Sequence, residues 1–285
     1  MAAKPAVKAK GATVKLDLAT CGGLVLALGG ILGGLVLEGG SIKDVAQVTA
    51  AMIVLGGTLG AVMVTTPVSV LIRASRRLPL VFLSRAQNAD AVIEELIGFA
   101  TKARKSGIVS LEQEVDQLPD PFLKKALSLA IDGMELKELR TMMELEIGLE
   151  EQSAEEEAKV YEAAGGYSPT IGIIGAVLGL IQVMKHLENI DEVGKGIAVA
   201  FVATVYGVGL ANIFFLPSGN KLKARARQTI MLRELVLEGV AGIVEGLNPK
   251  LIRSKLEAYA REEPAKKTAK RRRPEAAPAA APAKN

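Results

Sequence analysis

Four long windows without a charged residue constrain this chain more than any other feature of its sequence. They cover residues 18–37, 45–72, 163–184 and 196–219. A helix needs about 20 mainly apolar residues to cross the hydrocarbon core of a bilayer. A surface helix of a soluble protein keeps charged residues on its outer face, whereas these windows lack charge on every face. The sequence therefore predicts an all-α, polytopic membrane protein with four transmembrane helices and a helical cytoplasmic domain.

The composition agrees with helices that pack in lipid. Hydrophobic residues make up 49% of the 285 residues, yet there is no Trp and aromatic residues reach only 4%. The excess lies in aliphatic residues, Ala and Gly, which let membrane helices approach closely. One cysteine and one histidine provide neither a disulfide framework nor a metal cluster. We therefore expect no cofactor, and nothing in the sequence indicates an enzyme.

The first window has an alternative interpretation as a secretory signal peptide, because four lysines precede it. Its apolar core is too long for that role, and no clear cleavage motif follows. Lysine and arginine also follow the second and fourth windows, whereas the two short loops carry few. Since cytoplasmic loops are enriched in these residues, both termini and the long middle segment are expected in the cytoplasm.

The predicted organisation has six parts. They are a basic cytoplasmic N-terminus (1–17), transmembrane helices 1 and 2 (18–72), a cytoplasmic helical domain (73–162), transmembrane helices 3 and 4 (163–219), a cytoplasmic helix (220–260) and a disordered, basic Pro/Ala-rich tail (261–285). A tail of this composition suits solvent, or contact with anionic membrane lipid, and no nucleic-acid partner is predicted.

The middle segment has the period of an amphipathic helix. Val92, Leu96, Phe99 and Ala103 form one apolar stripe. Pro119 and Pro121 interrupt the pattern. From Phe122 onward, the charged helical pattern is expected to run as one long helix straight into the third window.

Small residues form rows in the third and fourth windows. In lipid, such rows mark the faces along which helices pack. Helix packing alone accounts for them, and we expect them at helix contacts. The residues are Gly172, Gly175 and Gly179 in the third window and Ala203, Gly207 and Ala211 in the fourth.

The polar residues of these two windows raise the possibility of an ion path. Thr170 and Thr204 offer hydroxyl oxygens on neighbouring small-residue helices, although a lone threonine usually bonds its own backbone. Ion pathways through membranes normally include an ionisable side chain, and no Asp, Glu, His, Lys or Arg lies in any window. Either the chain has no ion path, or another subunit donates the carboxylate.

Pro169 and Pro217 lie near the predicted cytoplasmic ends of the third and fourth windows. Proline removes a helical hydrogen bond and bends the helix. One interpretation makes them hinges between the membrane and the cytoplasmic segment. The plainer one makes Pro169 an ordinary helix start and Pro217 a helix stop.

Three motifs together resemble the MotA/PomA stator subunits of the MotA/TolQ/ExbB proton-channel family. YSPTIGIIGAVLGLI is similar to the third transmembrane segment of that family, and GIAVAFVATVYGVGLANIFFLPSGNKLK to the fourth. ATKARKSGIVSLE resembles a cytoplasmic signature of the family. With the four-span layout, the resemblance covers roughly residues 15–260.

The resemblance implies a role in the bacterial inner membrane. Family members form a homo-oligomeric ring, a pentamer, around a MotB-like single-span subunit that supplies the ion-binding aspartate. Ion flow turns the ring, which pushes the rotor protein FliG. The donated aspartate would explain the missing carboxylate.

The resemblance also implies roles for single residues. Pro169 and Pro217 match the coupling prolines, and Thr204 matches the ion-path threonine. The position of Ala176 resembles one that is filled by threonine in sodium-driven relatives. A methyl group offers no oxygen to a dehydrated cation, so Ala176 favours protons. Arg104 and Glu112 match the charged rotor-contact pair, which shares a helical face only if no turn intervenes at Gly107. A solvated, salt-bridging face is the alternative for that pair.

One departure and two alternatives complete the sequence-based picture. Ser218 and Gly219 stand where the family usually has small apolar residues, which predicts a looser helix exit after Pro217. A related ring subunit of the ExbB/TolQ type or of gliding motility is the nearest alternative function. A passive membrane scaffold, which conducts no ions, is the alternative from another class.

Overall fold

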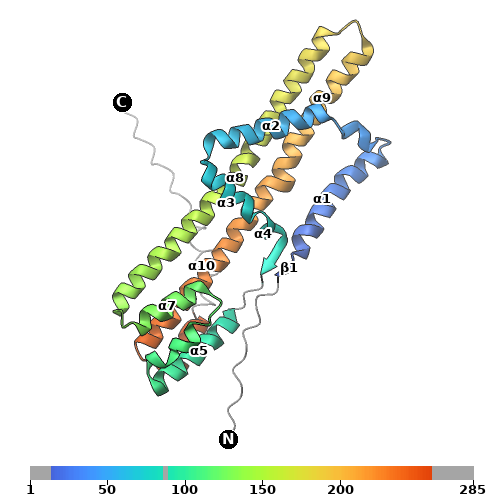
Figure 1. The fold of residues 1–285 in the computed structure, drawn as a ribbon. Coiled ribbons are helices and arrows are strands. Elements are labelled where there is room, and N and C mark those ends of the chain that lie inside the picture. The colour runs from blue at the N-terminus through green and yellow to red at the C-terminus, as the bar shows by residue number, and fades with distance from the viewer. Residues whose placement is uncertain (1–13, 86–88, 259–285) are drawn as a thin grey trace, which may run out of the picture. The chain divides into compact units, whose positions relative to one another are not determined.

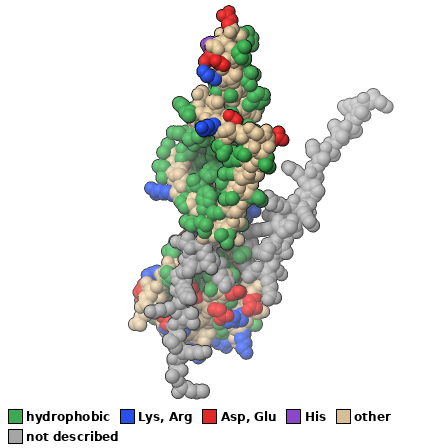
Figure 2. All heavy atoms as spheres, turned by 90° about the vertical axis from the view of Figure 1, so that its right-hand side faces the viewer, with side chains coloured by type: hydrophobic (Ala, Val, Ile, Leu, Met, Phe, Trp, Pro, Cys, Tyr) green, Lys and Arg blue, Asp and Glu red, His purple; other side chains and the backbone are tan. Residues whose placement is uncertain are grey.

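The computed structural model describes residues 14–85 and 89–258, and helices dominate it (Figure 1). The chain divides into two compact units. The first contains the residues up to 87 and residues 150–227, and the second contains residues 88–149 and those from 228 onward. Four described helices are long and apolar enough to cross a membrane, as the sequence predicts. Figure 2 shows hydrophobic side chains over much of the visible face of the first unit.

The first membrane-spanning helix, α1 (Leu18–Leu37), has no buried residue. Asp17 caps its N-terminus by accepting a hydrogen bond from the Thr20 N–H. Its Leu26 and Leu37 side chains are 78% and 90% exposed. A cooperative fold in water would bury such side chains, so α1 has the surface of a helix surrounded by lipid or by other membrane helices.

The window 45–72 is not the single helix that the sequence predicted. It contains the end of the 3-10 turn η1 (Ile42–Val45), the helix α2 (Val48–Thr65) and the start of α3 (Val68–Arg77). Pro67 causes the division, because a residue that precedes proline is pushed out of the helical region. Thr66 accordingly has extended backbone angles, φ −129° and ψ 131°.

A short ladder after α3 was not predicted. The turn α4 (Pro79–Phe82) leads into β2 (Leu83–Arg85), which pairs antiparallel with β1 (Val14–Leu16). Leu16 lies opposite Leu83 in this register. A strand of three residues is too short to leave a recognisable alternation in the sequence. The ladder joins the base of α1 to the segment that follows α3.

Two continuous helices carry the third and fourth windows. The α8 helix (Leu136–Lys185) begins well before the apolar window and continues through residue 163. The fourth window lies in α9 (Ile190–Gly209), the π-helical segment η3 (Leu210–Phe215) and α10 (Leu216–Val244), which follow one another without a break. The predicted boundaries at 162/163 and 219/220 therefore fall inside helices, because backbone hydrogen bonding continues where the side chains change from charged to apolar.

The second unit packs short helices around one hydrophobic core. It contains α5 (Ala89–Ser106), η2 (Ile108–Leu111), α6 (Glu112–Val115), α7 (Pro121–Ile131), the start of α8 and the end of α10. Leu96 and Phe99 of the predicted stripe are buried in this core, and Val92 and Ala103 pack against it. The stripe was therefore predicted correctly.

The long helix predicted from Phe122 onward is interrupted. The α7 helix ends at Ile131, and Gly133 follows with φ 81°. Glycine adopts this left-handed conformation without the steric penalty of a Cβ atom, and a residue in that conformation commonly follows the end of a helix. The chain then turns and starts α8 at Leu136. A second left-handed glycine, Gly246 with φ 69°, ends α10, so the predicted helix over 220–260 is also divided.

Glu238 is the centre of an ion-pair cluster in the second unit. Its carboxylate lies 2.7 Å from the Arg140 Nη1 and 2.7 Å from the Lys255 Nζ. The hydrogen bond from Arg140 is the main cause that lowers the pKa of Glu238 to about 2. A carboxyl whose folded pKa lies below its usual value of 4.5 stabilises the fold above that pH.

This cluster predicts a specific loss of stability in acid. As the pH falls from about 5 toward 2, protonation of Glu238 should remove its contribution. Glu238→Gln should therefore lower the melting temperature of the solubilised complex at pH 6 and flatten its decline toward pH 3. Circular dichroism would follow the melting. Glu112→Gln is the control, because that carboxylate is exposed and makes no ion pair within the described residues. Parallel pH profiles for wild type and Glu238→Gln would contradict the prediction.

Candidate functional site

The central feature of the first unit is the close contact between α8 and α9, which lie side by side in Figure 1. A Cβ atom added to Gly172 would lie 2.9 Å from the Ala203 carbonyl oxygen. One added to Gly179 would lie 2.7 Å from the Gly196 carbonyl oxygen, and one on Gly207 2.6 Å from the Ser168 carbonyl oxygen. Backbone atoms cannot move aside as flexible side chains can. Glycine is therefore required at this contact.

The structure brings together most of the small residues singled out in the sequence. A Cβ atom on Gly175 would meet the Ala203 methyl group at 2.7 Å. Ala203 and Gly207 are both buried, and so is Ala211 in η3. The α2 helix also packs on this pair, because a Cβ atom on Gly57 would lie 2.6 Å from the Ile171 side chain.

The three ion-path candidates lie on the two packed helices, Thr170 and Ala176 on α8 and Thr204 on α9. Thr170 is exposed, and its hydroxyl donates to the Tyr167 carbonyl at 2.8 Å. Thr204 is half-buried and donates to the Ala200 carbonyl at 3.2 Å. Each hydroxyl bonds its own helix and keeps lone pairs to offer a second group. Ala176 is half-buried on α8 next to the packed Gly175.

Several polar contacts of this region were not predicted. The Tyr206 hydroxyl donates to the Val45 carbonyl and so ties α9 to the turn before α2. Thr58 and Ser168 are fully buried, and their hydroxyls have no hydrogen-bond partner among the described residues. No spacing rule could have identified these three, because the partners or the burial come from helices distant in sequence.

Pro169 is not a helix start, because it lies inside α8. Proline cannot donate a hydrogen bond to the carbonyl four residues earlier, which is that of Gly165. A Cβ atom on Gly165 would lie 2.5 Å from the Leu216 Cδ2 atom. The helix turn weakened by Pro169 therefore rests against the residue that precedes Pro217.

Pro217 is not a helix stop, because α10 continues through it. The π-helical segment η3 ends two residues earlier, at Phe215. Such wider turns accommodate a local loss of the regular hydrogen-bond pattern and often mark functional positions. Both prolines are thus internal to continuous helices, as hinges would be.

The helix exit after Pro217 is tight, which corrects the prediction of a looser exit. Ser218 is 2% exposed and Gly219 is buried. A Cβ atom on Gly219 would lie 3.1 Å from the Glu162 Cγ atom and 3.2 Å from the Ala158 carbonyl oxygen. The two small residues let α10 approach α8.

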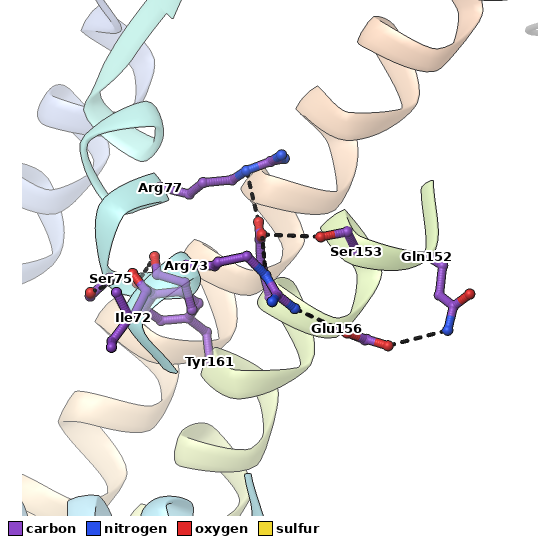
Figure 3. A network of polar contacts seen from close by, with 10 residues as sticks. Ile72, Arg73, Ser75, Arg77, Gln152, Ser153, Glu156 and Tyr161 are labelled. Carbon is purple, nitrogen blue, oxygen red and sulfur yellow. Dashed lines mark hydrogen bonds and ion pairs between the residues drawn. The ribbon is translucent and has the colours of Figure 1, made fainter. Parts of the chain in front are cut away.

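A network of ion pairs holds α3 against α8 just beyond the apolar windows (Figure 3). The buried Glu157 carboxylate lies 2.7 Å from the Arg77 Nε and 3.4 Å from the Arg73 Nε. The Tyr161 hydroxyl donates to the Ala74 carbonyl at 3.0 Å. A buried carboxylate is tolerated only when cations and donors compensate its lost hydration, and two guanidinium groups do so here.

A second ion-pair group joins the base of α1 to α10. Asp17 lies 2.7 Å from both the Lys221 Nζ and the Arg225 Nη2. The hydrogen bond from Lys221 is the main cause that lowers the pKa of Asp17 to about 2. Lys223 adds a 2.7 Å pair with Glu162 of α8. The start of α1, α8 and the helix after Pro217 are therefore linked by charge.

The structure separates Arg104 and Glu112 by a turn. Arg104 lies in the last turn of α5, Gly107 follows with φ 79°, and Glu112 begins α6. Both side chains are exposed, and neither makes an ion pair within the described residues. Nearby Lys102 does pair, with Glu114 at 2.8 Å. Arg104 and Glu112 therefore form no salt-bridging face of their own, and both side chains are accessible to a partner.

Comparison with known proteins agrees with the fold. Residues 114–235 match the model of the MotA/TolQ/ExbB proton channel family, and residues 21–107 match that of the motility protein A N-terminal region. Motility protein A of Bacillus subtilis is 36% identical over 86% of this chain and 91% of the relative. Its counterpart from Helicobacter pylori strain 26695 is 38% identical over 86% of this chain and 95% of the relative.

Two solved structures share the fold. The C. jejuni MotAB structure aligns with a TM-score of 0.82 and 34% identity, covering 86% of this chain and 96% of that chain. The flagellar MotAB stator complex of Bacillus subtilis aligns with a TM-score of 0.80 and 34% identity, covering 90% of this chain and 100% of that chain.

Fold and site together define a multi-span membrane subunit of a proton channel family, not an enzyme family. The chain belongs to the MotA/TolQ/ExbB proton channel family and, within it, to the motility protein A subunits of flagellar stators. It is accordingly an inner-membrane protein.

Gly207 and Gly209 offer a matched test of the α8–α9 contact. Gly207→Ala should destabilise the assembled protein by about 1–3 kcal/mol, because its Cβ atom would press on backbone. Gly209→Ala should be neutral or slightly stabilising, since nothing lies within 4 Å of a Cβ atom there. Thermal unfolding of the purified complex measures both. Equal effects of the two substitutions would mean that the contact is looser than described.

Proposed function

We propose that this chain couples ion flow across the inner membrane to rotation of the flagellar rotor. One observation carries the proposal. The closely packed α8–α9 pair provides hydroxyl oxygens from Thr170 and Thr204, yet neither apolar window contains an Asp, Glu, His, Lys or Arg side chain. An ion path along this pair therefore needs a carboxylate from another subunit. A single-span, MotB-like partner that supplies an aspartate meets this need.

The ion is a proton in this proposal. Ala176 presents a methyl group where a dehydrated sodium ion would require another oxygen ligand. The transported proton is cargo, and the chain needs no bound cofactor. The oxygens of the two threonines would line the path beside the partner's carboxylate.

A homo-oligomeric ring around that partner is part of the proposal, with five copies by family resemblance. The exposed apolar side chains of α1 are consistent with it, because such a surface suits either neighbouring copies or lipid. Both termini lie in the cytoplasm in this arrangement, since lysine and arginine gather at the same ends.

Coupling would run through the two prolines. Both lie inside continuous helices, and their surroundings touch at the contact of Gly165 with Leu216. A change in the bend of one helix at its proline would therefore displace the other helix near its own proline. The Glu157 network and the Asp17 group would carry that motion to α3 and to the base of α1. Arg104 and Glu112, exposed and without ion pairs, would contact the rotor protein FliG.

The ion-path role of Thr204 can be tested with two substitutions. Thr204→Val keeps the shape of the side chain but removes its oxygen, and it should lower proton leak through an unplugged complex by about tenfold, equivalent to about 1.4 kcal/mol. Thr204→Ser retains the oxygen and should keep most of the leak. Flux would be measured in vesicles with a pH-sensitive dye, after assembly is verified by size-exclusion chromatography.

A control without the partner tests the donated carboxylate. This chain expressed alone should give no leak above empty vesicles. Conductance by the chain alone would overturn that part of the proposal, and unchanged flux in Thr204→Val would leave Thr204 only a packing role.

If Arg104 contacts the rotor, a substitution there should reduce torque without changing proton flux. Arg104→Glu should reduce the stall torque of tethered cells severalfold, because the reversed charge repels the surface that it met. Proton leak should stay unchanged. Lys137→Glu, a charge reversal at another exposed basic residue of the second unit, is the control for net charge. Full torque in Arg104→Glu would return that residue to a solvated surface role.

A further inference from the structure

A cavity of about 320 Å³ opens beside Arg104 in the second unit. The ends of α5, α7 and α10 surround it, and these helices gather in the same part of Figure 1. Two of the left-handed glycines, Gly133 and Gly246, lie in its wall. Each ends a helix without adding a side chain, so the turns leave the space open.

The chemistry of the wall is simple. Ala100, Ala103, Ile108, Met134 and Leu247 are among its lining residues. Ala100 belongs to the buried core, and the other four pack against that core. Arg104 is the only charged lining residue, and it makes no ion pair within the described residues. The cavity therefore suits an apolar group that carries one negative charge at its edge.

The chain's own C-terminal segment fits poorly as the occupant. The chain's own C-terminal segment after residue 258 contains eight lysines and arginines against three acidic residues. Its charge therefore has the same sign as Arg104. An external partner with complementary charge fits better.

We propose that this cavity receives an apolar side chain of the rotor protein, while a neighbouring carboxylate of that protein pairs with Arg104. The inference rests on the proposed function, in which Arg104 meets the rotor, and it adds the apolar anchor. Interfaces draw most of their affinity from a few side chains that fill pockets, with charged groups at the rim setting orientation and encounter rate. A charge contact alone would be weak in water.

Graded filling of the cavity in the already folded complex tests the anchor. Cys21, the only cysteine, is first replaced by alanine. Ala103→Cys is then introduced, and the folded, partner-bound complex is treated with methyl, propyl or pentyl thiosulfonate reagents. Thr101→Cys is the matched control, because it is exposed on the same helix and does not line the cavity. Binding of the complex in lipid nanodiscs to immobilised rotor protein is measured after each treatment, together with proton leak.

The expected result is a stepwise loss of rotor affinity at position 103, reaching about tenfold with the longest reagent, and no loss at position 101. Leak should be unchanged in both. Equal losses at the two positions, or none at position 103, would overturn the cavity proposal. Arg104→Glu in the same assay separates the two ideas. If it weakens binding while the mixed disulfide at 103 does not, rotor contact stands and the anchor falls. If neither has an effect, both fall.

Discussion

The backbone-to-backbone approach of α8 and α9 is the contact on which the rest of this structure depends. In lipid, helices gain little from burying apolar side chains, so their association relies on close packing. Gly172, Gly179 and Gly207 allow that packing because backbone of the other helix fills the space that a side chain would occupy. The same packing brings Gly165, one turn before Pro169, against Leu216, which directly follows η3. A single added methyl group at this seam would therefore disturb both the membrane pair and the hinge region.

Ion pairs connect the helices just beyond the ends of the apolar windows. The pair of Glu157 with Arg77 joins α8 to α3, and the pairs of Asp17 with Lys221 and Arg225 join the start of α1 to α10. These pairs are buried or half-buried, so they hold geometry in a way that exposed pairs do not. Arg104 and Glu112 show the opposite arrangement, exposed and without ion pairs in the described part of the chain. The contrast separates charges that build the subunit from charges that are open to a partner.

Much of this architecture could be predicted from the sequence. The four windows, the helical class and the small-residue rows follow from periodicity and from the absence of charge, which are local properties of the chain. The motifs around Pro169, Tyr206 and Arg104 pointed to the right family. Helix ends were predicted less well. Pro67 and Gly133 divide segments whose hydrophobic pattern runs on, because backbone angles and not side-chain polarity decide where a helix stops.

The sequence by itself determined that this chain crosses a membrane four times and that any ion-binding carboxylate must come from elsewhere. Both conclusions need only residue types, since charge in hydrocarbon is costly wherever the helix lies. Tertiary structure alone decided which glycines are indispensable, that both prolines lie inside continuous helices, and that Ser218 and Gly219 tighten the exit. It also created the cavity beside Arg104 from the ends of three helices. These features depend on distances between residues far apart in the chain, and no local pattern encodes such distances.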